Sequence, residues 1–189
     1  MTTRVLCLGN ALLADDALGP EVAARLRSLE LKDVEVVETA ETGFYLLDHV
    51  LGCTRLVVID TVVTGSVPPG AIRQSSEQDL RGPFGGSPHY VGLFETLAAG
   101  RQLGLPVPGE VIILAVEGED LTSVGGAVSP AVRRAIPEVV RRVLEHWVFS
   151  EACQDENQTQ GPDPGLIEET RDAGQGCKPD VRHQPKGEC

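Results

Sequence analysis

The sequence predicts an α/β fold, a three-layer α/β/α sandwich whose central sheet is twisted, mainly parallel and built of about five strands. Short apolar runs alternate with amphipathic stretches along residues 1–150, the order that produces a parallel sheet with helices on both faces. The length of 189 residues suffices for one domain with its own core. The hydrophobic share of 41% is ordinary for a globular protein.

The strands are predicted from short apolar runs bounded by glycine, proline or polar residues. Such runs are typical of strands that are buried on both faces of a parallel sheet. The run Ala71–Arg73 follows the turn Pro68-Pro69-Gly70, which favours an edge strand there. In chain order, the predicted strands cover residues 5–8, 34–37, 56–59, 71–73 and 111–116.

The helices are predicted from apolar residues at helical spacing together with signals for helix starts. Pro20 suits a first helical turn, where its missing N–H is not needed. Ser129, before Pro130, is a typical N-cap. Pro137 lies within the helix that follows and is expected to kink or divide it. The predicted helices cover residues 20–29, 44–51, 91–103 and 130–148.

A change of composition after Ser150 divides the chain into a domain of residues 1–150 and a tail of residues 151–189. The tail is acidic and rich in proline and glycine, and Leu166-Ile167 is its only apolar pair. It cannot bury enough apolar surface to offset the entropy of ordering, so the sequence predicts disorder there.

The net charge of −12 disfavours nucleic acid as a partner, because a surface that binds phosphates needs a basic stripe. No apolar run approaches the roughly 20 residues that cross a bilayer, so we expect no membrane insertion and a cytoplasmic protein. The cysteines form no compact disulfide framework. No coiled-coil seam is visible, which favours a monomer.

Asp16, Asp60 and His89 are the candidate functional residues, since each is expected where a strand has just ended or in a turn-rich run. Side chains past the carboxyl ends of strands converge on one crevice in an open α/β sheet, and two carboxylates with an imidazole suit a divalent metal. Competing interpretations remain for each. Asp15 and Asp16 also suit the capping of the next helix. Asp60 also suits a buried carboxylate that is paired with another group, and His89 also suits an exposed position in a turn.

Other chemistries have less support from the motifs. Gly9 and Gly19 are ten residues apart, so the phosphate-binding pattern G-x-G-x-x-G is missing. The nucleophile elbow G-x-S-x-G does not occur, and Cys7 is expected to be packing material inside a strand. In the tail, Cys177, His183 and Cys189 do not have a recognised zinc spacing.

Four stretches in order resemble the hydrogenase maturation endopeptidases, the proteases that trim the large subunit of nickel-iron hydrogenases. The resemblance covers about residues 4–148. The stretches are Gly9-Asn10-x-Leu12-x-x-Asp15-Asp16-x-x-Gly19, the apolar strand through Asp60 with Pro69-Gly70, Ser87-Pro88-His89-x-x-Gly92-Leu93, and Gly125-Gly126-x-x-Ser129-Pro130-x-Val132 after the last strand.

The resemblance implies an endopeptidase that removes the C-terminal extension of a nickel-loaded large-subunit precursor. By position, Asp16, Asp60 and His89 would bind the nickel, which belongs to the substrate rather than to the enzyme, and would form the catalytic set. The expected partner is the precursor. Asp16 or Asp60 would also serve to activate water, and the sequence does not apportion these roles.

The segment Glu38-Thr39-Ala40-Glu41-Thr42-Gly43 departs from the glycine-rich loop that the family has after its second strand. It keeps only Gly43 and adds the charge of Glu41. Two other functions remain open from the sequence. A non-enzymatic nickel-binding maturation chaperone would use the same three residues without cutting, and a small-molecule-binding α/β domain would use the turn from Gly9 to Gly19.

Removing residues 151–189 is expected to leave folding and precursor processing nearly unchanged, because this composition builds no core and no motif of the resemblance lies in it. Circular dichroism and a processing assay with nickel-loaded precursor check this expectation. The competing hypothesis is that Cys177, His183 and Cys189 deliver nickel or contact the hydrogenase. A truncated protein that folds but no longer processes the precursor would support that hypothesis.

Overall fold

The computed structural model describes residues 2–77 and 90–155 and contains a five-stranded sheet in the order β2-β1-β3-β5-β4. All neighbouring strands are parallel except β4 and β5, which are antiparallel. The predicted mainly parallel sheet with an edge strand is therefore confirmed. The strands are β1 (Thr3–Leu8), β2 (Val34–Thr39), β3 (Arg55–Val62), β4 (Ile72–Ser76) and β5 (Glu110–Glu117).

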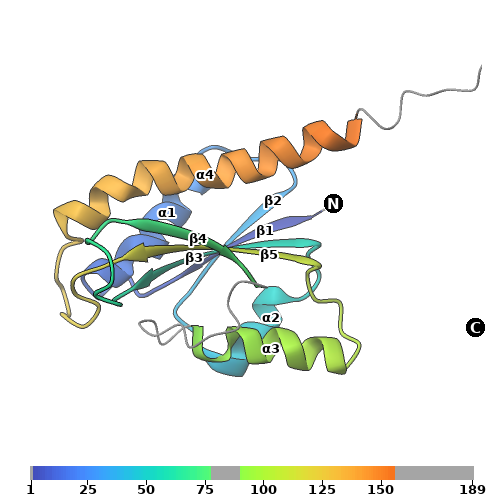
Figure 1. Ribbon diagram of the computed structural model, residues 1–189, viewed down its shortest axis with the longest axis horizontal. Coiled ribbons are helices and arrows are strands. Elements are labelled where there is room, and N and C mark those ends of the chain that lie inside the picture. The colour runs from blue at the N-terminus through green and yellow to red at the C-terminus, as the bar shows by residue number, and fades with distance from the viewer. Residues whose placement is uncertain (1, 78–89, 156–189) are drawn as a thin grey trace, which may run out of the picture.

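Helices cover both faces of the sheet, which completes the predicted three layers. Helices α1 and α4 lie on one face, while α2 and α3 lie on the other (Figure 1). The segment expected as one short helix at 44–51 is a 3-10 helix followed by a single α-helical turn. The helices are η1 (Asp15–Ala17), α1 (Leu18–Arg27), η2 (Gly43–Leu46), α2 (Leu47–Val50), α3 (Tyr90–Gln102) and α4 (Pro130–Asp155).

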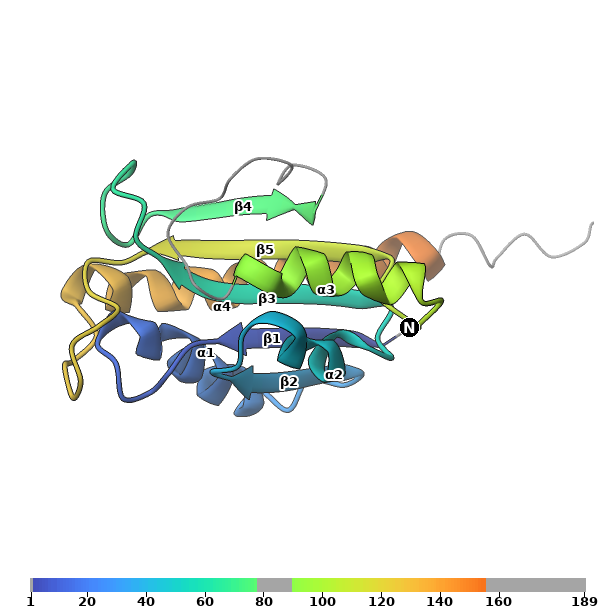
Figure 2. The same cartoon turned by 90° about the horizontal axis from the view of Figure 1, so that it is seen from below.

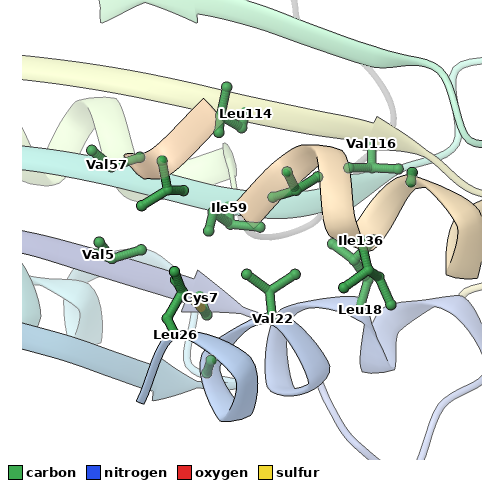
Figure 3. Packing of buried hydrophobic residues seen from close by; sticks show 14 of the residues in the cluster. Val5, Cys7, Leu18, Val22, Leu26, Val57, Ile59, Leu114, Val116 and Ile136 are labelled. Atoms are coloured by element: carbon green, nitrogen blue, oxygen red, sulfur yellow. The ribbon is translucent and has the colours of Figure 1, made fainter. Parts of the chain in front are cut away.

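Alternation along the central strands divides the core between the two faces. Val5 and Cys7 of β1 point toward α1 and α4, where they meet Val22 of α1 (Figure 3). Leu6 and Leu8 point to the opposite face and pack in the cluster that includes helix α3. Successive side chains of a strand face opposite ways, so a continuous apolar run supplies both cores, as predicted for a strand buried on both faces.

Helix α4 begins as the sequence predicts, because the hydroxyl of Ser129 accepts a hydrogen bond from the N–H of Val132 (3.4 Å). Pro137 was expected to kink or divide this helix, and division is wrong, since α4 is one helix through that residue. Proline inside a helix costs about 3 kcal/mol. Ile136 and Val139 flank it and are fully buried in the core beside the sheet, and this packing offsets the cost.

Helix α4 also continues beyond Val148, where the sequence analysis ended it, to Asp155. Residues 151–155 include glutamate, alanine and glutamine, which favour helix. The helix therefore enters the segment expected as tail, and the remaining tail prediction concerns residues outside the described ranges. No helix in those ranges combines the length and apolar character needed to cross a membrane.

Candidate active site at the carboxyl ends of β1 and β3

After β1 the chain goes through α1 to β2 on one side of the sheet, whereas after β3 it goes through β4 and α3 to β5 on the other side. Helices α1 and α3 of these two connections lie on opposite faces of the sheet (Figure 1). The loops after β1 and β3 therefore diverge at a topological switch point. Open α/β sheets bind their ligands in the crevice at such a point, so this edge is the candidate site.

Asp16 lies in η1, directly beyond the end of β1, as the sequence analysis expected. Its residue surface is only 5% exposed. The backbone N–H of Asn10 donates a hydrogen bond to its Oδ2 (2.8 Å), so the side chain is turned back toward the residues that end β1. The carboxylate is therefore held in place by backbone rather than carried on a free loop.

Gly9 and Gly19 make this fold-back possible through close backbone approach. A Cβ on Gly9, which has a φ of +139°, would lie 2.1 Å from the carbonyl oxygen of Asp16. A Cβ on Gly19 would lie 2.0 Å from the carbonyl oxygen of Leu8. Both distances are impossible for real atoms, so the two glycines are required by the packing of the β1–α1 connection, which explains their presence without a phosphate ligand.

Asp60 lies inside β3 rather than just beyond its end, which corrects the sequence analysis. The strand continues to Val62, and Asp60 pairs in register with Ala115 of β5. The β-branched residues Thr61 and Val62 favour this extension. Asp60 is fully buried, and its Oδ1 accepts a hydrogen bond from the N–H of Thr61 (2.8 Å).

A hydrogen bond joins the two acidic segments across the switch point. The hydroxyl of Thr61, the neighbour of Asp60, donates to the backbone carbonyl of Asp15, the neighbour of Asp16 (3.1 Å). The fold thus brings together the segments that carry Asp16 and Asp60, although 43 residues, including β2 and α2, lie between these two aspartates in the sequence. The convergence of these two predicted positions is a property of the sheet topology.

His89 lies outside the described residues, and α3 begins at the next position, Tyr90. Within residues 2–77 and 90–155, no group of three histidine, cysteine, aspartate or glutamate side chains is placed to hold a metal ion. The metal set of Asp16, Asp60 and His89 includes a residue from outside those ranges, so it stays a prediction.

Asp15 does not cap α1 but joins two loops. The N-cap of α1 is Ala17, whose side chain has no hydrogen-bonding atom. The Asp15 carboxylate is 1% exposed and accepts backbone hydrogen bonds from Glu119 (2.8 Å), Asp120 (3.3 Å) and Ser129 (2.6 Å). It therefore ties the segment before α1 to both ends of the loop between β5 and α4.

The loops after β1 and β5 lie side by side along their length (Figure 2). The N–H of Ala14 donates to the carbonyl of Ser123 (3.1 Å), and the N–H of Gly125 donates to the carbonyl of Leu12 (2.7 Å). An isolated β-bridge pairs Leu13 with Val124. The two loops form one hydrogen-bonded unit with the segment that carries Asp16.

Glu117, at the end of β5, is a buried acid that the sequence analysis missed. Its carboxylate accepts hydrogen bonds from the N–H of Thr64 (2.6 Å), the N–H of Gly65 (2.7 Å) and the hydroxyl of Thr64 (2.7 Å). It thereby shapes the loop after β3. The same signal that selected Asp60, an acid at the end of an apolar run, was present at Glu117.

The charge of Glu41, in the segment that departs from the family pattern, is directed toward α2. Its Oε2 lies 2.6 Å from Nε2 of His49. The same segment is tied to α3 by the hydroxyl of Thr96, which donates to the carbonyl of Gly43 (3.1 Å). The sequence analysis flagged Glu41 but did not recognise His49 as its partner.

Cys7 and Cys53 do not suit nucleophilic catalysis. Burial raises the pKa of Cys7 to about 12, so its thiol is protonated at neutral pH and serves as packing. Burial also raises the pKa of Cys53. A shallow pocket beside Cys53 lies at the amino end of β3, at the opposite edge of the sheet from Asp16.

Comparison with known proteins assigns this chain to a family. The family model described as hydrogenase maturation protease matches residues 20–146. That range includes Asp60 and position 89 and begins after Asp16. The chain belongs to the hydrogenase maturation protease family, and this membership places it among the endopeptidases.

Individual relatives agree with this assignment. The hydrogenase expression/formation protein HupD of Thiocapsa roseopersicina is 29% identical over 147 residues, which are 75% of this chain and 66% of HupD, slightly less than two thirds. The hydrogenase 2 maturation protease of Escherichia coli (strain K12) is 28% identical over 148 residues, which are 76% of this chain and 89% of that protein.

A solved structure shares the fold. The hydrogenase maturating endopeptidase HybD from E. coli superposes with a TM-score of 0.67 at 26% identity. The match covers 79% of this chain and 94% of HybD. The predicted fold class and the family resemblance seen in the sequence are therefore both confirmed.

Replacing Asp15 with asparagine is expected to lower the free energy of unfolding by about 3 kcal/mol, because an amide replaces a buried carboxylate that accepts three N–H groups. Urea denaturation measures the change, and amide hydrogen exchange at Glu119 and Ser129 should be faster. Asp48→Asn, at an exposed position of α2, is the control. Unchanged stability and exchange in Asp15→Asn would contradict the assignment of Asp15 as the joint between the loops.

Proposed function

We propose that this protein removes the C-terminal extension from a nickel-loaded large-subunit precursor of a nickel-iron hydrogenase, in the cytoplasm. Membership in the maturation protease family supports the endopeptidase class and a hydrogenase precursor as partner. The observation that carries the proposal is the hydrogen bond between Thr61 and Asp15, which brings the segments of Asp60 and Asp16 to one switch point of the sheet.

In this proposal the nickel is part of the substrate, and Asp16, Asp60 and His89 complete its coordination. Carboxylate and imidazole donors suit a divalent transition metal. Asp16 is fixed by the N–H of Asn10, and Asp60 belongs to a central strand. Ligands held on such rigid elements recognise a metal with little loss of conformational freedom on binding.

Recognition of nickel would allow the enzyme to verify metal insertion before an irreversible cut. A precursor that carries nickel is held by the three side chains, and this contact positions its C-terminal segment for attack. A metal-free precursor lacks the contact, so the rate gain from proximity and orientation is lost. Asp16 or Asp60 would act as general base toward the attacking water.

The observations favour this function over the two alternatives considered from the sequence. A nickel-binding chaperone would share the three residues, but the relatives include proteins named as proteases and endopeptidases. A small-molecule-binding domain would use the turn from Gly9 to Gly19. There the space near Gly9 is taken by the carbonyl of Asp16.

Asp16→Asn, Asp60→Asn and His89→Ala are each expected to reduce processing of the nickel-loaded precursor by at least about a hundredfold while leaving the protein folded, because each removes one donor to the metal. Mass spectrometry of the precursor measures the cut, and circular dichroism monitors the fold. Asp33→Asn, in an exposed turn, and His183→Ala, in the tail, are the matched controls. Wild-type processing by His89→Ala would remove that residue from the site.

Cleavage is also expected to depend on nickel in the substrate. The metal-free precursor should remain uncut, because the contact that orients the scissile bond is missing, whereas a chelating buffer should have little effect once the loaded precursor has formed. The measurement compares cleavage of both precursor forms under identical conditions, with the wild-type enzyme in each. Efficient cutting of the metal-free form would instead indicate a protease that activates water without reading the metal.

A further inference from the structure

Most of the exposed large apolar side chains lie in loops at the end of the sheet that holds the candidate active site. In residues 2–77 and 90–155, the large apolar side chains that are exposed are Leu12, Leu29, Phe44, Tyr45, Val63, Leu103 and Val124. All but Leu29 and Leu103 lie in segments that follow the carboxyl end of a parallel strand. Exposed apolar side chains on ordered loops beside a candidate site are available to contact a partner.

Leu12 and Val124 are the two members of this group that stand on directly hydrogen-bonded loops. Leu12 is 67% exposed and Val124 is 81% exposed. The N–H of Gly125 donates to the carbonyl of Leu12 (2.7 Å), and Val124 pairs with Leu13 in a β-bridge. We call Leu12 and Val124 the apolar tip. In Figure 2 their loops lie together beyond the ends of β1 and β5.

The apolar tip is ordered by local hydrogen bonds rather than by burial of its side chains. Asp120 Oδ1 accepts bonds from the N–H groups of Thr122 (2.9 Å) and Ser123 (3.0 Å), which fix the turn before Val124. The carboxylate of Asp15 then ties this loop to the segment that carries Asp16. A partner that binds the apolar tip is therefore held at a fixed distance from Asp16.

The charges beside the tip indicate what kind of surface it fits. Glu119 and Asp120 precede Val124 on the same loop. Hydrogen bonds from Ser123 and Thr122 hold the pKa of Asp120 below its ordinary value, so this carboxylate is ionised at neutral pH. An apolar tip flanked by two carboxylates is complementary to an apolar patch with a basic rim on a folded protein.

We propose that the apolar tip, Leu12 and Val124, binds the folded body of the protein substrate. The C-terminal segment of the substrate is thereby presented to the end of the sheet that holds Asp16 and Asp60. This inference rests on the proposed function, which supplies a folded protein as substrate. The occupant is the substrate because the tip is joined to the Asp16 segment by Asp15 and belongs to the same edge of the sheet.

The test is a comparison of Leu12→Ser and Val124→Ser with the wild-type protein, using nickel-loaded precursor as substrate. Each substitution is expected to raise KM roughly tenfold, the effect of losing one buried aliphatic contact, and to leave kcat unchanged. KM should also rise with salt, since the acidic flank contributes to the encounter. Leu103→Ser is the control, because Leu103 is 72% exposed and follows the C-terminal end of α3.

A binding measurement separates this inference from the proposed function. The precursor is titrated against Asp60→Asn protein with and without Leu12→Ser and Val124→Ser, and weaker binding of the tip variants supports docking whether or not cleavage occurs. A wild-type protein that binds the precursor but never cuts it removes the proposed function alone. Unchanged KM and unchanged binding in the tip variants, or a fall in kcat with KM unaltered, overturns the docking proposal.

Discussion

The buried carboxylate of Asp15 is the contact on which the arrangement of the candidate site depends. It accepts three backbone N–H groups from a loop more than 100 residues away in the sequence. Its own backbone carbonyl accepts a fourth bond from Thr61 of β3. Hydrogen bonds to a charged acceptor are stronger than neutral ones, and a buried charge without them would be costly. One residue thus joins the connection after β1, the strand that carries Asp60 and the entry to α4.

The fold was predictable because its signals are local. The apolar runs in β1, β3 and β5 are continuous, which indicates strands buried on both faces of the sheet. Ser129 marks the start of α4 because its hydroxyl caps the helix. The errors have tertiary causes. Asp60 appeared to end its strand because it is charged, but pairing with β5 continues to Val62. Pro137 was expected to kink or divide α4, but the helix is not divided, and buried Ile136 and Val139 on either side of the proline hold it together.

The candidate site was predictable only in part. The rule that strand ends converge led to Asp16 and Asp60, and the structure joins their segments through Thr61 and Asp15. Asp15 itself, Glu117 and the pair of Glu41 with His49 all depend on partners distant in the sequence or in another element. A single sequence shows an acid at each of these positions but not which backbone groups or side chains face it. The roles of the acids therefore emerged from the three-dimensional contacts.

The filled turn after β1 has a consequence for the electrostatics of this type of sheet. Doubly wound sheets commonly use their first strand-to-helix turn as a receptor for anions, with glycine backbone and the positive end of a helix facing a phosphate. Here Gly9 admits the carbonyl of Asp16 and Gly19 admits the carbonyl of Leu8, and two buried aspartates occupy the turn. Carboxylates in this turn would repel a phosphate. What fills a single turn thus decides whether a sheet of this strand order can receive an anion there.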